Sequence, residues 1–262
     1  MKTTISLAQT NIQLGDVEGN LSSILPLVKE AAGQGSQLIL LPELWSSGYD
    51  LENREKYHHE NQRLLPLLLK AAQNSRIWIG GSWIEKENGN FLNTFLLIDP
   101  QGNIAAKYSK IHLFGLMDEV QWLKSGNSIQ IASFPWGSAG LAICYDLRFP
   151  ELFRRYGIEG VPVTLIVAQW PTRRIDHWST LLRARAIENQ MFIAAVNCVG
   201  QIGKELFGGK SAVINPWGEA ITEGSEAEAC LLTTEIDLGE VQRVRQWMPV
   251  FKDRRPEIYD AE

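Results

Sequence analysis

Three residues with complementary reactive groups each follow a short apolar segment of the sequence. Glu43 follows the residues LILLP, Lys110 ends the segment IAAKYSK, and Cys144 follows GLAI. A carboxylate can accept a thiol proton, a thiolate can attack a carbonyl carbon, and an ammonium group can stabilise the oxyanion that forms. Each residue alone is more often structural, because free Cys is commonly packed in cores and Glu and Lys are commonly solvated. The coincidence of all three carries the hypothesis of acyl-transfer chemistry.

The segment from Gly140 to Leu152, GLAICYDLRFPEL, has the pattern of a strand, a turn and the start of a helix. A cysteine at such a strand end presents its sulfur at an open sheet edge, where backbone N–H groups of the turn can point at a bound group. Cys198 and Cys230 lie instead within strand-like segments, so we expect them to pack in the core. A reactive Cys144 should therefore be alkylated by iodoacetamide before the other two.

The elements that position these residues follow from the hydrophobic pattern. Strands are predicted at residues 3–9, 37–41, 77–85, 91–99, 104–110, 129–134, 140–144, 164–169, 191–196, 211–215 and 229–236. Helices are predicted from a cap at Asn20 to residue 32, at 64–74, 149–156 and 178–189, and from a cap at Asp237 to residue 247. Strands outnumber helices, and hairpins alternate with strand–helix–strand units. This order predicts a single α/β domain over residues 1–262, a four-layer α-β-β-α sandwich of two mixed β-sheets.

Composition and charge disfavour several classes of function. The 262 residues carry a net charge of −5 with a pI of about 5.5, whereas binding to a nucleic-acid backbone needs a basic face. We expect neither a signal peptide nor a membrane span, because no apolar run approaches roughly 18 residues. The three cysteines are odd in number and far apart, which favours reduced thiols and a cytoplasmic location. The four histidines lack ligand spacing, so no metal site is predicted.

Five longer segments place the three residues in a known context. They are PEL (residues 42–44), KIHLF (110–114), CYDLRFPEL (144–152), QWP (169–171) and RARAIENQ (183–190). In order and approximate spacing they resemble segments of the nitrilase superfamily of carbon–nitrogen hydrolases, and the resemblance extends over essentially the whole chain. It implies the four-layer sandwich and a triad of Glu43 as general base, Lys110 as oxyanion-stabilising cation and Cys144 as nucleophile. It also implies that neither a metal nor an organic cofactor is needed.

The same resemblance implies further roles. The backbone N–H of Tyr145 would be a second oxyanion donor, and a glutamate after the lysine segment would position the substrate. Glu119 is the candidate for that glutamate, and its neighbour Asp118 stays open. The segments HLFGLMDE and QWPTRRIDHW look most like those of ω-amidases that hydrolyse 2-oxoglutaramate. This likeness implies a small-molecule ω-amide as substrate, hydrolysed to a carboxylate and ammonia through a thioester.

Residues near these loops are candidates for binding the far end of such a substrate. Two acids beside the reacting amide disfavour a negative group there, so a substrate carboxylate must point elsewhere. Arg173 and Arg174 follow the predicted strand that ends near Trp170, and arginine can hold a carboxylate with two hydrogen bonds. The open alternative is that both arginines are solvated or pair with Asp176. Tyr49 and Trp170 are candidates for the pocket walls.

Other functions stay open at this point. Nitrilases and N-carbamoyl-amide hydrolases share the triad, whereas a non-catalytic binding module of this fold would be expected to lose one of its members. A Ser-His-Asp hydrolase is disfavoured, because GGSWI at residues 80–84 lacks the final glycine of the G-x-S-x-G motif. Family members commonly pair, so the resemblance implies a homodimer or larger homo-oligomer. The polar, proline-interrupted tail at residues 249–262 is the segment expected to reach across to the partner.

Overall fold

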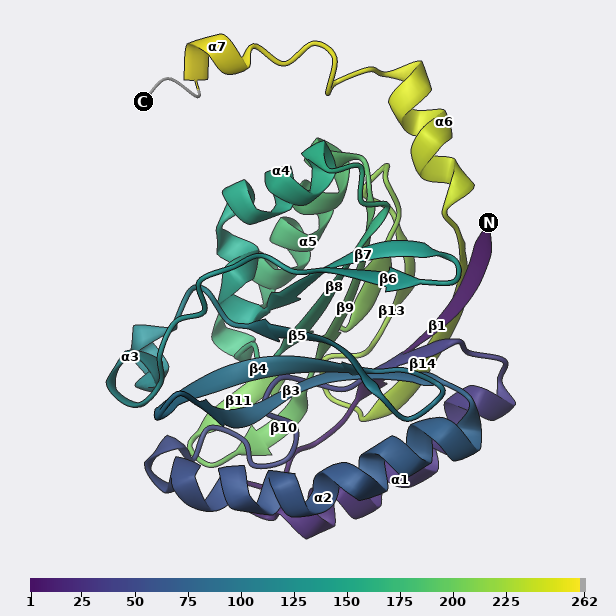
Figure 1. Cartoon of the computed structure of the whole chain (residues 1–262). Coiled ribbons are helices and arrows are strands. Elements are labelled where there is room, and N and C mark those ends of the chain that lie inside the picture. Colours follow the sequence, from purple (N-terminus) through teal and green to yellow (C-terminus); the bar gives the residue numbers. More distant parts are fainter. Residues whose placement is uncertain (260–262) are drawn as a thin grey trace.

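Two mixed β-sheets form the centre of the computed structural model, which describes residues 1–259 (Figure 1). The first sheet has the strand order β14-β1-β2-β3-β4-β5, and the second has the order β13-β12-β9-β8-β7-β6. The first sheet consists of β1 (Lys2–Gln9), β2 (Leu38–Leu40), β3 (Trp78–Glu87), β4 (Asn90–Ile98), β5 (Ile104–Ser109) and β14 (Cys230–Asp237). The second consists of β6 (Ile131–Phe134), β7 (Gly137–Ile143), β8 (Val163–Ala168), β9 (Phe192–Asn197), β12 (Ala212–Ile214) and β13 (Ala220–Glu223). The neighbours β1–β2–β3 and β7–β8–β9 are parallel, and the other pairs are antiparallel.

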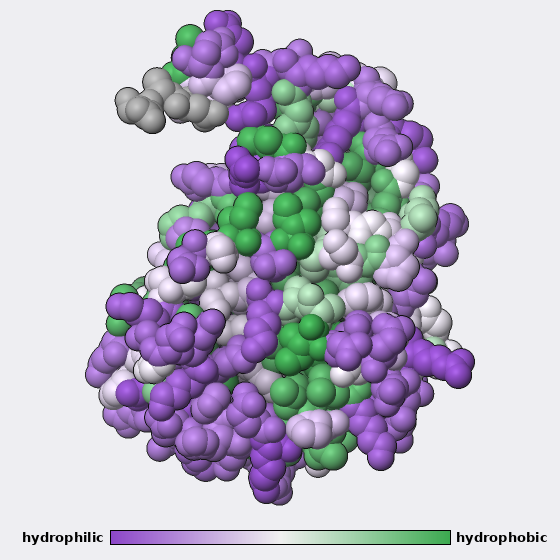
Figure 2. All heavy atoms as spheres, viewed as in Figure 1, coloured by the Kyte–Doolittle hydropathy of each residue, from purple (hydrophilic) through white to green (hydrophobic). Residues whose placement is uncertain are grey.

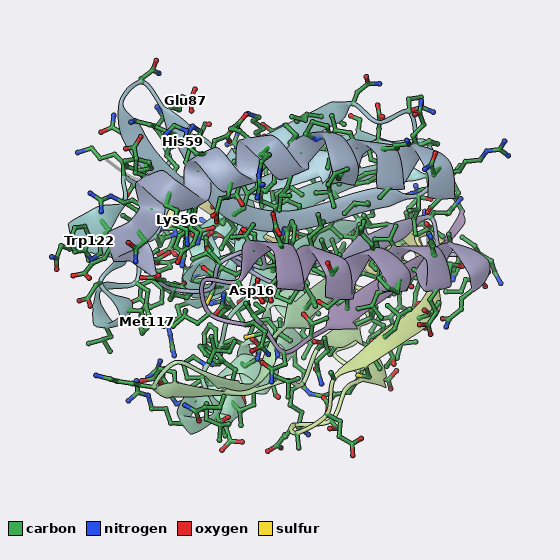
Figure 3. All side chains as sticks on the ribbon, turned by 90° about the horizontal axis from the view of Figure 1, so that it is seen from below. Asp16, Lys56, His59, Glu87, Met117 and Trp122 are labelled. Carbon is green, nitrogen blue, oxygen red and sulfur yellow. The ribbon has the colours of Figure 1, made fainter. Side chains whose placement is uncertain are left out.

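Helices cover the outer face of each sheet. The helices α1 (Val17–Gly33) and α2 (Arg54–Ser75) lie side by side on the first sheet, and the labelled Lys56 and His59 mark the start of α2 (Figure 3). The second sheet is covered by α4 (Pro150–Ile158) and α5 (Ile175–Asn189) (Figure 1). The shorter helices are α3 (Glu119–Trp122), α6 (Gly239–Trp247) and α7 (Pro256–Tyr259), with 3₁₀ turns η1 (Leu51–Asn53), η2 (Gly115–Met117), η3 (Cys144–Arg148) and η4 (Thr172–Arg174). The predicted α-β-β-α sandwich is confirmed.

The core lies in two layers, and strand β4 contributes to both. Phe95 and Leu97 belong to the cluster between the two sheets, whereas Leu96 and Ile98 belong to the cluster beneath α1 and α2. This alternation is the period-two pattern of a strand. Asn93, two residues before Phe95, therefore shares its face and is directed toward the sheet interface, where it is fully buried. The same alternation determines which strand-end side chains meet between the sheets.

Three helix starts differ from the prediction, and one of them is that of α5, which begins at Ile175 rather than at residue 178. The predicted cap at Asn20 is wrong, because α1 begins at Val17 and the Asp16 side chain accepts a hydrogen bond from Gly19 N at 3.0 Å. Asn20 is buried, and its amide donates to two backbone carbonyls. The second helix begins at Arg54 rather than at residue 64. Its first turns are rich in polar residues, so the apolar periodicity on which the prediction rested starts only further along the helix.

A hairpin that the sequence pattern did not predict lies beside η4. It consists of β10 (Val199–Ile202) and β11 (Glu205–Gly208), which pair only with each other within the described residues. The segment has three glycines and no sustained alternation of apolar and polar residues, so its strands lack a sequence signal. A backbone bridge from Pro171 to Phe207 joins the hairpin to the start of η4. The hairpin therefore helps to fix the loop that follows β8.

The C-terminal segment leaves the sheets and passes above α4 (yellow in Figure 1). Asp237 accepts a hydrogen bond from Gly239 N at 3.0 Å, close to its predicted capping role, although the capping position of α6 is Leu238. A hollow of about 610 Å³ lies between this segment and α4. Figure 2 shows apolar side chains in an irregular band that runs from the top toward the bottom of the same face, with polar side chains on both sides of it. Among residues 1–259, no helix has the length and apolar character needed to cross a membrane.

Candidate active site

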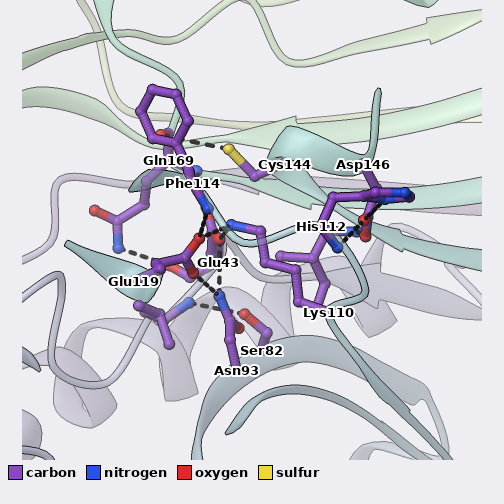
Figure 4. A network of polar contacts seen from close by, with 12 residues as sticks. Glu43, Ser82, Asn93, Lys110, His112, Phe114, Glu119, Cys144, Asp146 and Gln169 are labelled. Carbon is purple, nitrogen blue, oxygen red and sulfur yellow. Dashed lines mark hydrogen bonds and ion pairs between the residues drawn. The ribbon is translucent and has the colours of Figure 1, made fainter. Parts of the chain in front are cut away.

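Glu43 lies fully buried between the two sheets, just after β2. Its Oε1 accepts three hydrogen bonds, from Tyr49 Oη at 2.7 Å, Asn93 Nδ2 at 2.8 Å and Lys110 Nζ at 2.8 Å (Figure 4). Its Oε2 accepts one, from the backbone N–H of Gln169 at 2.9 Å. A carboxylate has about four lone-pair directions. Oε1 is therefore saturated, and Oε2 is the oxygen that retains capacity to accept a proton.

Lys110 follows β5, and its ammonium group bridges two carboxylates. Its Nζ donates to Glu43 Oε1 and, at 2.6 Å, to Glu119 Oε2, and all three side chains are fully buried. Glu119 Oε2 also accepts the N–H of Phe114 at 2.7 Å, and Asn93 Nδ2 lies 3.1 Å from Glu119 Oε1. Within this cluster, two acids share one ammonium group. The structure brings in Glu119, whereas Asp118 is exposed.

Burial and charge act against each other in this cluster. Burial alone would lower the pKa of Lys110, but the facing carboxylates of Glu119 and Glu43 raise it above its usual value. The pKa of Glu119 is raised, chiefly by burial and further by Glu43, against the opposing effect of Lys110. The cation is therefore held firmly, whereas the second acid is only partly compensated.

Cys144 stands where β7 meets η3, with a backbone φ of +45°. This is the left-handed region, which non-glycine residues rarely occupy, and it turns the side chain out of the strand direction. The sulfur lies 3.7 Å from the carbonyl oxygen of Gln169. Burial raises the pKa of the thiol well above its usual value, Glu43 adds to this effect, and Lys110 opposes it. Attack by Cys144 therefore requires transfer of the thiol proton to a nearby base.

The amide of Tyr145 belongs to the first turn of η3. The N–H groups of a first helical turn have no partner inside the helix, and they favour negative charge. The Tyr145 amide lies directly after Cys144, and its role as oxyanion donor stays a prediction.

A narrow pocket opens onto the sulfur. It is lined by Phe114, Cys144, Tyr145, Arg148, Gln169, Trp170, Pro171 and Arg174. The free cavity volume is about 10 Å³, which is room for about one water molecule. Two arginine side chains lie over its aromatic walls, with Arg148 4.7 Å from the ring of Trp170 and Arg174 5.2 Å from the ring of Phe114. Phe114 and Arg174, which contact each other, are both lining residues of this small pocket.

The two pocket arginines have no acidic partner among residues 1–259. Arg148 Nη2 lies 3.3 Å from His177 Nδ1, and the buried Nη2 of Arg174 has no hydrogen-bond partner. Burial, with the neighbouring cations Arg173 and Arg148, lowers the pKa of Arg174. A cation in this state gains from an anion that enters the pocket.

The sequence candidates for substrate binding have different locations. Arg173 is directed outward by η4, is 58% exposed and pairs with Glu205 of β11 at 3.0 Å. Trp170 is buried in the pocket wall, and its Nε1 donates to the carbonyl of Arg174 at 2.7 Å. Tyr49 contacts the base itself, and its hydroxyl also lies 3.3 Å from Lys110 Nζ.

Sequence reasoning missed two polar residues of this region. Arg148 lies in the segment CYDLRFPEL, four residues after the cysteine, and a charged residue in a segment rich in apolar side chains could have indicated it. Asn93 interrupts the apolar run of β4, and a buried polar residue in a strand needs a partner. Within residues 1–259, no group of three or more His, Cys, Asp or Glu residues is arranged to hold a metal ion.

Comparisons with known proteins give a consistent result. The carbon-nitrogen hydrolase family model matches residues 4–246. The 2-oxoglutaramate amidase of Bacillus subtilis (strain 168) is 39% identical over 261 residues, which cover 99% of this chain and 100% of that protein. The human Omega-amidase NIT2 is 32% identical over 276 residues, covering 99% of this chain and 98% of that one.

A solved structure adds chemistry to this likeness. The amidase mutant from Nesterenkonia sp. AN1 with the acetamide moiety of fluoroacetamide added covalently to its active-site cysteine superposes with a TM-score of 0.88. It is 25% identical, and the match covers 98% of this chain and 95% of that one. An amide-type group can therefore reach a cysteine in a protein of this fold.

Proposed function

Because this chain belongs to the carbon–nitrogen hydrolase family, we propose that it is a cysteine-dependent amidase that hydrolyses a small ω-amide of the 2-oxoglutaramate type. The observation that carries the proposal is the buried ammonium group of Lys110, held between Glu43 and Glu119 beside a buried thiol. A base, a nucleophile and an oxyanion-stabilising cation then act within one cluster. Single-domain organisation over residues 1–262 is part of the same proposal.

In the first half of the reaction, Cys144 becomes acylated. Glu43 Oε2, the oxygen with spare capacity, accepts the thiol proton as the sulfur attacks the amide carbon. The carbonyl oxygen gains negative charge, which Lys110 Nζ and the N–H of Tyr145 stabilise. The C–N bond then breaks, the nitrogen takes the proton from Glu43, and ammonia leaves a thioester on the sulfur.

In the second half, water completes the hydrolysis. Glu43 accepts a proton from a water molecule, whose oxygen attacks the thioester carbon. The same two donors stabilise the second tetrahedral species, and its collapse breaks the C–S bond. The thiol regains its proton, and the carboxylic acid product ionises. The sum is one amide and one water converted to a carboxylate and an ammonium ion.

The acids of the cluster favour an amide over a nitrile. An amide NH₂ donates two hydrogen bonds, and a nitrile nitrogen donates none. Glu43 Oε2 and Glu119 Oε1 each accept one hydrogen bond and can accept another, which an amide NH₂ can donate and a nitrile cannot. This asymmetry is the type that gives large discrimination between substrates.

The arginines support a carboxylate at the far end of the substrate. Arg148 and Arg174 line the pocket without an acidic partner among the described residues, and the pocket lining includes neither Glu43 nor Glu119. Binding a compound of this length requires the Phe114–Arg174 contact to open, because the free volume holds only about one water. A substrate carboxylate replaces the contact that Arg174 makes with the ring.

Ammonia release tests the proposal with 2-oxoglutaramate, a neutral ω-amide of equal length and an aliphatic nitrile of equal length. We expect kcat/KM to fall in that order. Arg174→Gln should raise KM for 2-oxoglutaramate about 10- to 100-fold, since it removes a partly buried charge that faces the pocket, and should leave the neutral amide unaffected.

Arg173→Gln is the matched control, because that side chain is exposed and pairs with Glu205. We expect its KM to stay within about twofold of the wild type, as for most exposed ion pairs. A preference for the nitrile would contradict the amidase proposal. An unchanged KM in Arg174→Gln would contradict the carboxylate clamp alone.

We also propose that the protein works in the cytoplasm as a homodimer or larger homo-oligomer. Support comes from the apolar side chains of Trp247, Ile258 and Tyr259 near the C-terminus, which are exposed to solvent rather than packed in the core. Residues 260–262 of the predicted tail lie outside the described residues. Light scattering at micromolar concentration tests the assembly, and a stable, fully active monomer would refute it.

A further inference from the structure

A third buried carboxylate, that of Asp146, lies two residues after Cys144. Asp146 is fully buried and accepts four hydrogen bonds. Its Oδ2 accepts from Tyr108 Oη at 2.7 Å and Ile143 N at 2.9 Å. Its Oδ1 accepts from His112 N at 3.1 Å and His112 Nδ1 at 2.8 Å (Figure 4). All four lone-pair directions of the carboxylate are used.

The residues that provide these donors, together with Asp146, bracket Lys110 and Cys144 in the sequence. The proposed reaction requires these two residues to be aligned. Tyr108 lies two residues before Lys110, and His112 lies two residues after it. Ile143 directly precedes Cys144, and Asp146 follows it by two residues. One carboxylate thus joins the chain on both sides of the lysine to the chain on both sides of the cysteine.

Both bracketed residues need such support. Cys144 has a φ of +45°, and a non-glycine residue in this region carries strain of order 1–3 kcal/mol that surrounding contacts must hold. Lys110 lies just past the end of β5, and its N–H donates to the Asn93 carbonyl at 2.9 Å, which holds it to β4 but not to the cysteine turn of the other sheet. Burial and Asp146 raise the pKa of Tyr108 well above its usual value, so its hydroxyl remains a donor.

The His112 ring also contacts the chain beyond the cysteine turn. It stacks on Phe149, the residue before α4, with ring centroids 3.6 Å apart and an interplanar angle of 7°. A carboxylate only accepts, so Nδ1 of His112 must carry a proton. The ring therefore has two separable contacts, a hydrogen bond to Asp146 and a stack on Phe149.

We propose that Asp146 and His112 form a positioning pair that sets Lys110 Nζ in register with Cys144 Sγ. The pair touches neither substrate nor reacting atoms, and its catalytic effect rests on the proposed amidase function. Loss of the hydrogen bond lets the lysine segment shift relative to the cysteine turn. A shift of about 1 Å at a catalytic group can cost about 100-fold in rate. The loss should appear in kcat rather than in KM, because the transition state is the species affected.

Two variants of His112 separate the hydrogen bond from the stack. His112→Phe keeps an aromatic ring against Phe149 and removes the Nδ1 donor. His112→Asn keeps an N–H donor near the Nδ1 position and removes the stack. We expect kcat to fall about 10- to 100-fold in His112→Phe with KM unchanged, and to stay within about threefold in His112→Asn.

A second matched pair uses tyrosines. Tyr108→Phe removes a donor to Asp146, whereas Tyr57→Phe removes a donor to Asp50 on the helix side of the first sheet. Both tyrosines are almost fully buried, so both variants lose one buried hydrogen bond to a carboxylate. Only Tyr108→Phe should lower kcat, even where thermal unfolding shows equal losses of stability.

Alkylation of Cys144 by iodoacetamide provides a readout that does not depend on the natural substrate. Slower alkylation in His112→Phe than in His112→Asn supports the positioning pair even if the wild type releases no ammonia from any ω-amide. If the wild type is an amidase and His112→Phe keeps both full kcat and the wild-type alkylation rate, the positioning pair is refuted and the amidase stands. A kcat that follows melting temperature across all four variants would also refute it, because a purely structural role predicts that result.

Discussion

Two buried carboxylate clusters flank Cys144, and their charge balance differs. Asp146 stands alone as an acid and receives four donors. On the other side, Glu43 and Glu119 share the single ammonium group of Lys110, so the cluster carries a net negative charge when both acids are ionised. A fully satisfied acid is held in one state, whereas a partly compensated acid can exchange a proton. The Asp146 cluster is therefore suited to holding geometry, and the cluster of Glu43 and Glu119 is suited to moving protons.

Glu43 shows the same contrast within a single side chain. Three donors on Oε1 fix the orientation of the carboxylate, and Oε2 is left with one. The carboxylate is thereby fixed and reactive at once.

Removing the nucleophile should have the largest effect. Cys144→Ala leaves both carboxylate clusters in place but provides no atom to form the thioester. We expect turnover to fall by at least about 10⁴-fold, the scale of a lost nucleophile. Ammonia release is the measurement, and circular dichroism checks that the fold is retained. Turnover close to wild type would mean that hydrolysis does not proceed through this sulfur.

Removing the shared cation should lower both activity and stability. Lys110→Met keeps much of the side-chain volume but leaves Glu43 and Glu119 buried without their counter-ion. We expect kcat to fall at least about 100-fold from the lost oxyanion donor. Unpairing a buried ion pair typically costs about 3–5 kcal/mol, so chemical denaturation should show a marked loss. Glu43→Gln is the comparison, with a similar loss of kcat and a smaller loss of stability because it removes one of the excess acids.

Removing one donor from Glu43 should have an intermediate effect. Tyr49→Phe deletes the hydroxyl that bonds Oε1 and leaves the ring in place. The carboxylate keeps two donors on that oxygen, so its orientation is weakened but not lost. We expect kcat to fall about tenfold with a small change in KM. A large rise in KM with unchanged kcat would instead identify Tyr49 as a wall that binds the substrate, which is the role expected from sequence.

The strand-end positions of Glu43, Lys110 and Cys144 could be predicted because each follows an apolar run, and runs of this kind end at the edge of a sheet. The choice between Glu119 and Asp118 could not, because it depends on the backbone turn at Asp118, whose φ is +59°. The partners of Asp146 could not be predicted either. Apart from Ile143, they are Tyr108 and His112, which lie 38 and 34 positions away in the sequence, and such contacts leave no periodic signal.

Which of the two neighbouring arginines faces the pocket could not be predicted either, because it depends on local backbone geometry. Arg173 and Arg174 are adjacent in sequence, and a 3₁₀ turn directs one to Glu205 and the other toward Phe114. The sequence could supply the residue type but not its direction. Directions set by short irregular turns depend on the hairpin packed beside them, and that hairpin had no sequence signal.

The smallest expected effect is on the pH dependence of stability. It tests whether Glu43 and Glu119 leave their cluster with an excess of negative charge. Burial raises the pKa of Glu119 above the ordinary value of 4.5. At a pH between 4.5 and this raised pKa, the folded protein therefore binds more protons than the unfolded chain. The free energy of unfolding contributed by this group then falls as pH rises from about 4.5 through the folded pKa. Glu119→Gln has no titrating carboxyl group at this position, so its free energy of unfolding does not show this fall with rising pH. The melting temperature of the variant minus that of the wild type should therefore increase with pH.

The introduced amide also brings a cost that does not depend on pH. Its NH₂ group faces Asn93 Nδ2, which already donates to Glu119 Oε1 in the wild type, so one donor meets another. The absolute melting temperature can therefore lie on either side of the wild type, and the test is the slope between pH 4.5 and 8. For a protein of this size, 1 kcal/mol corresponds to about 2–4 °C. A difference that is constant or shrinks with rising pH would show that Lys110 fully compensates both acids, and the contrast with Asp146 would then lie in geometry alone.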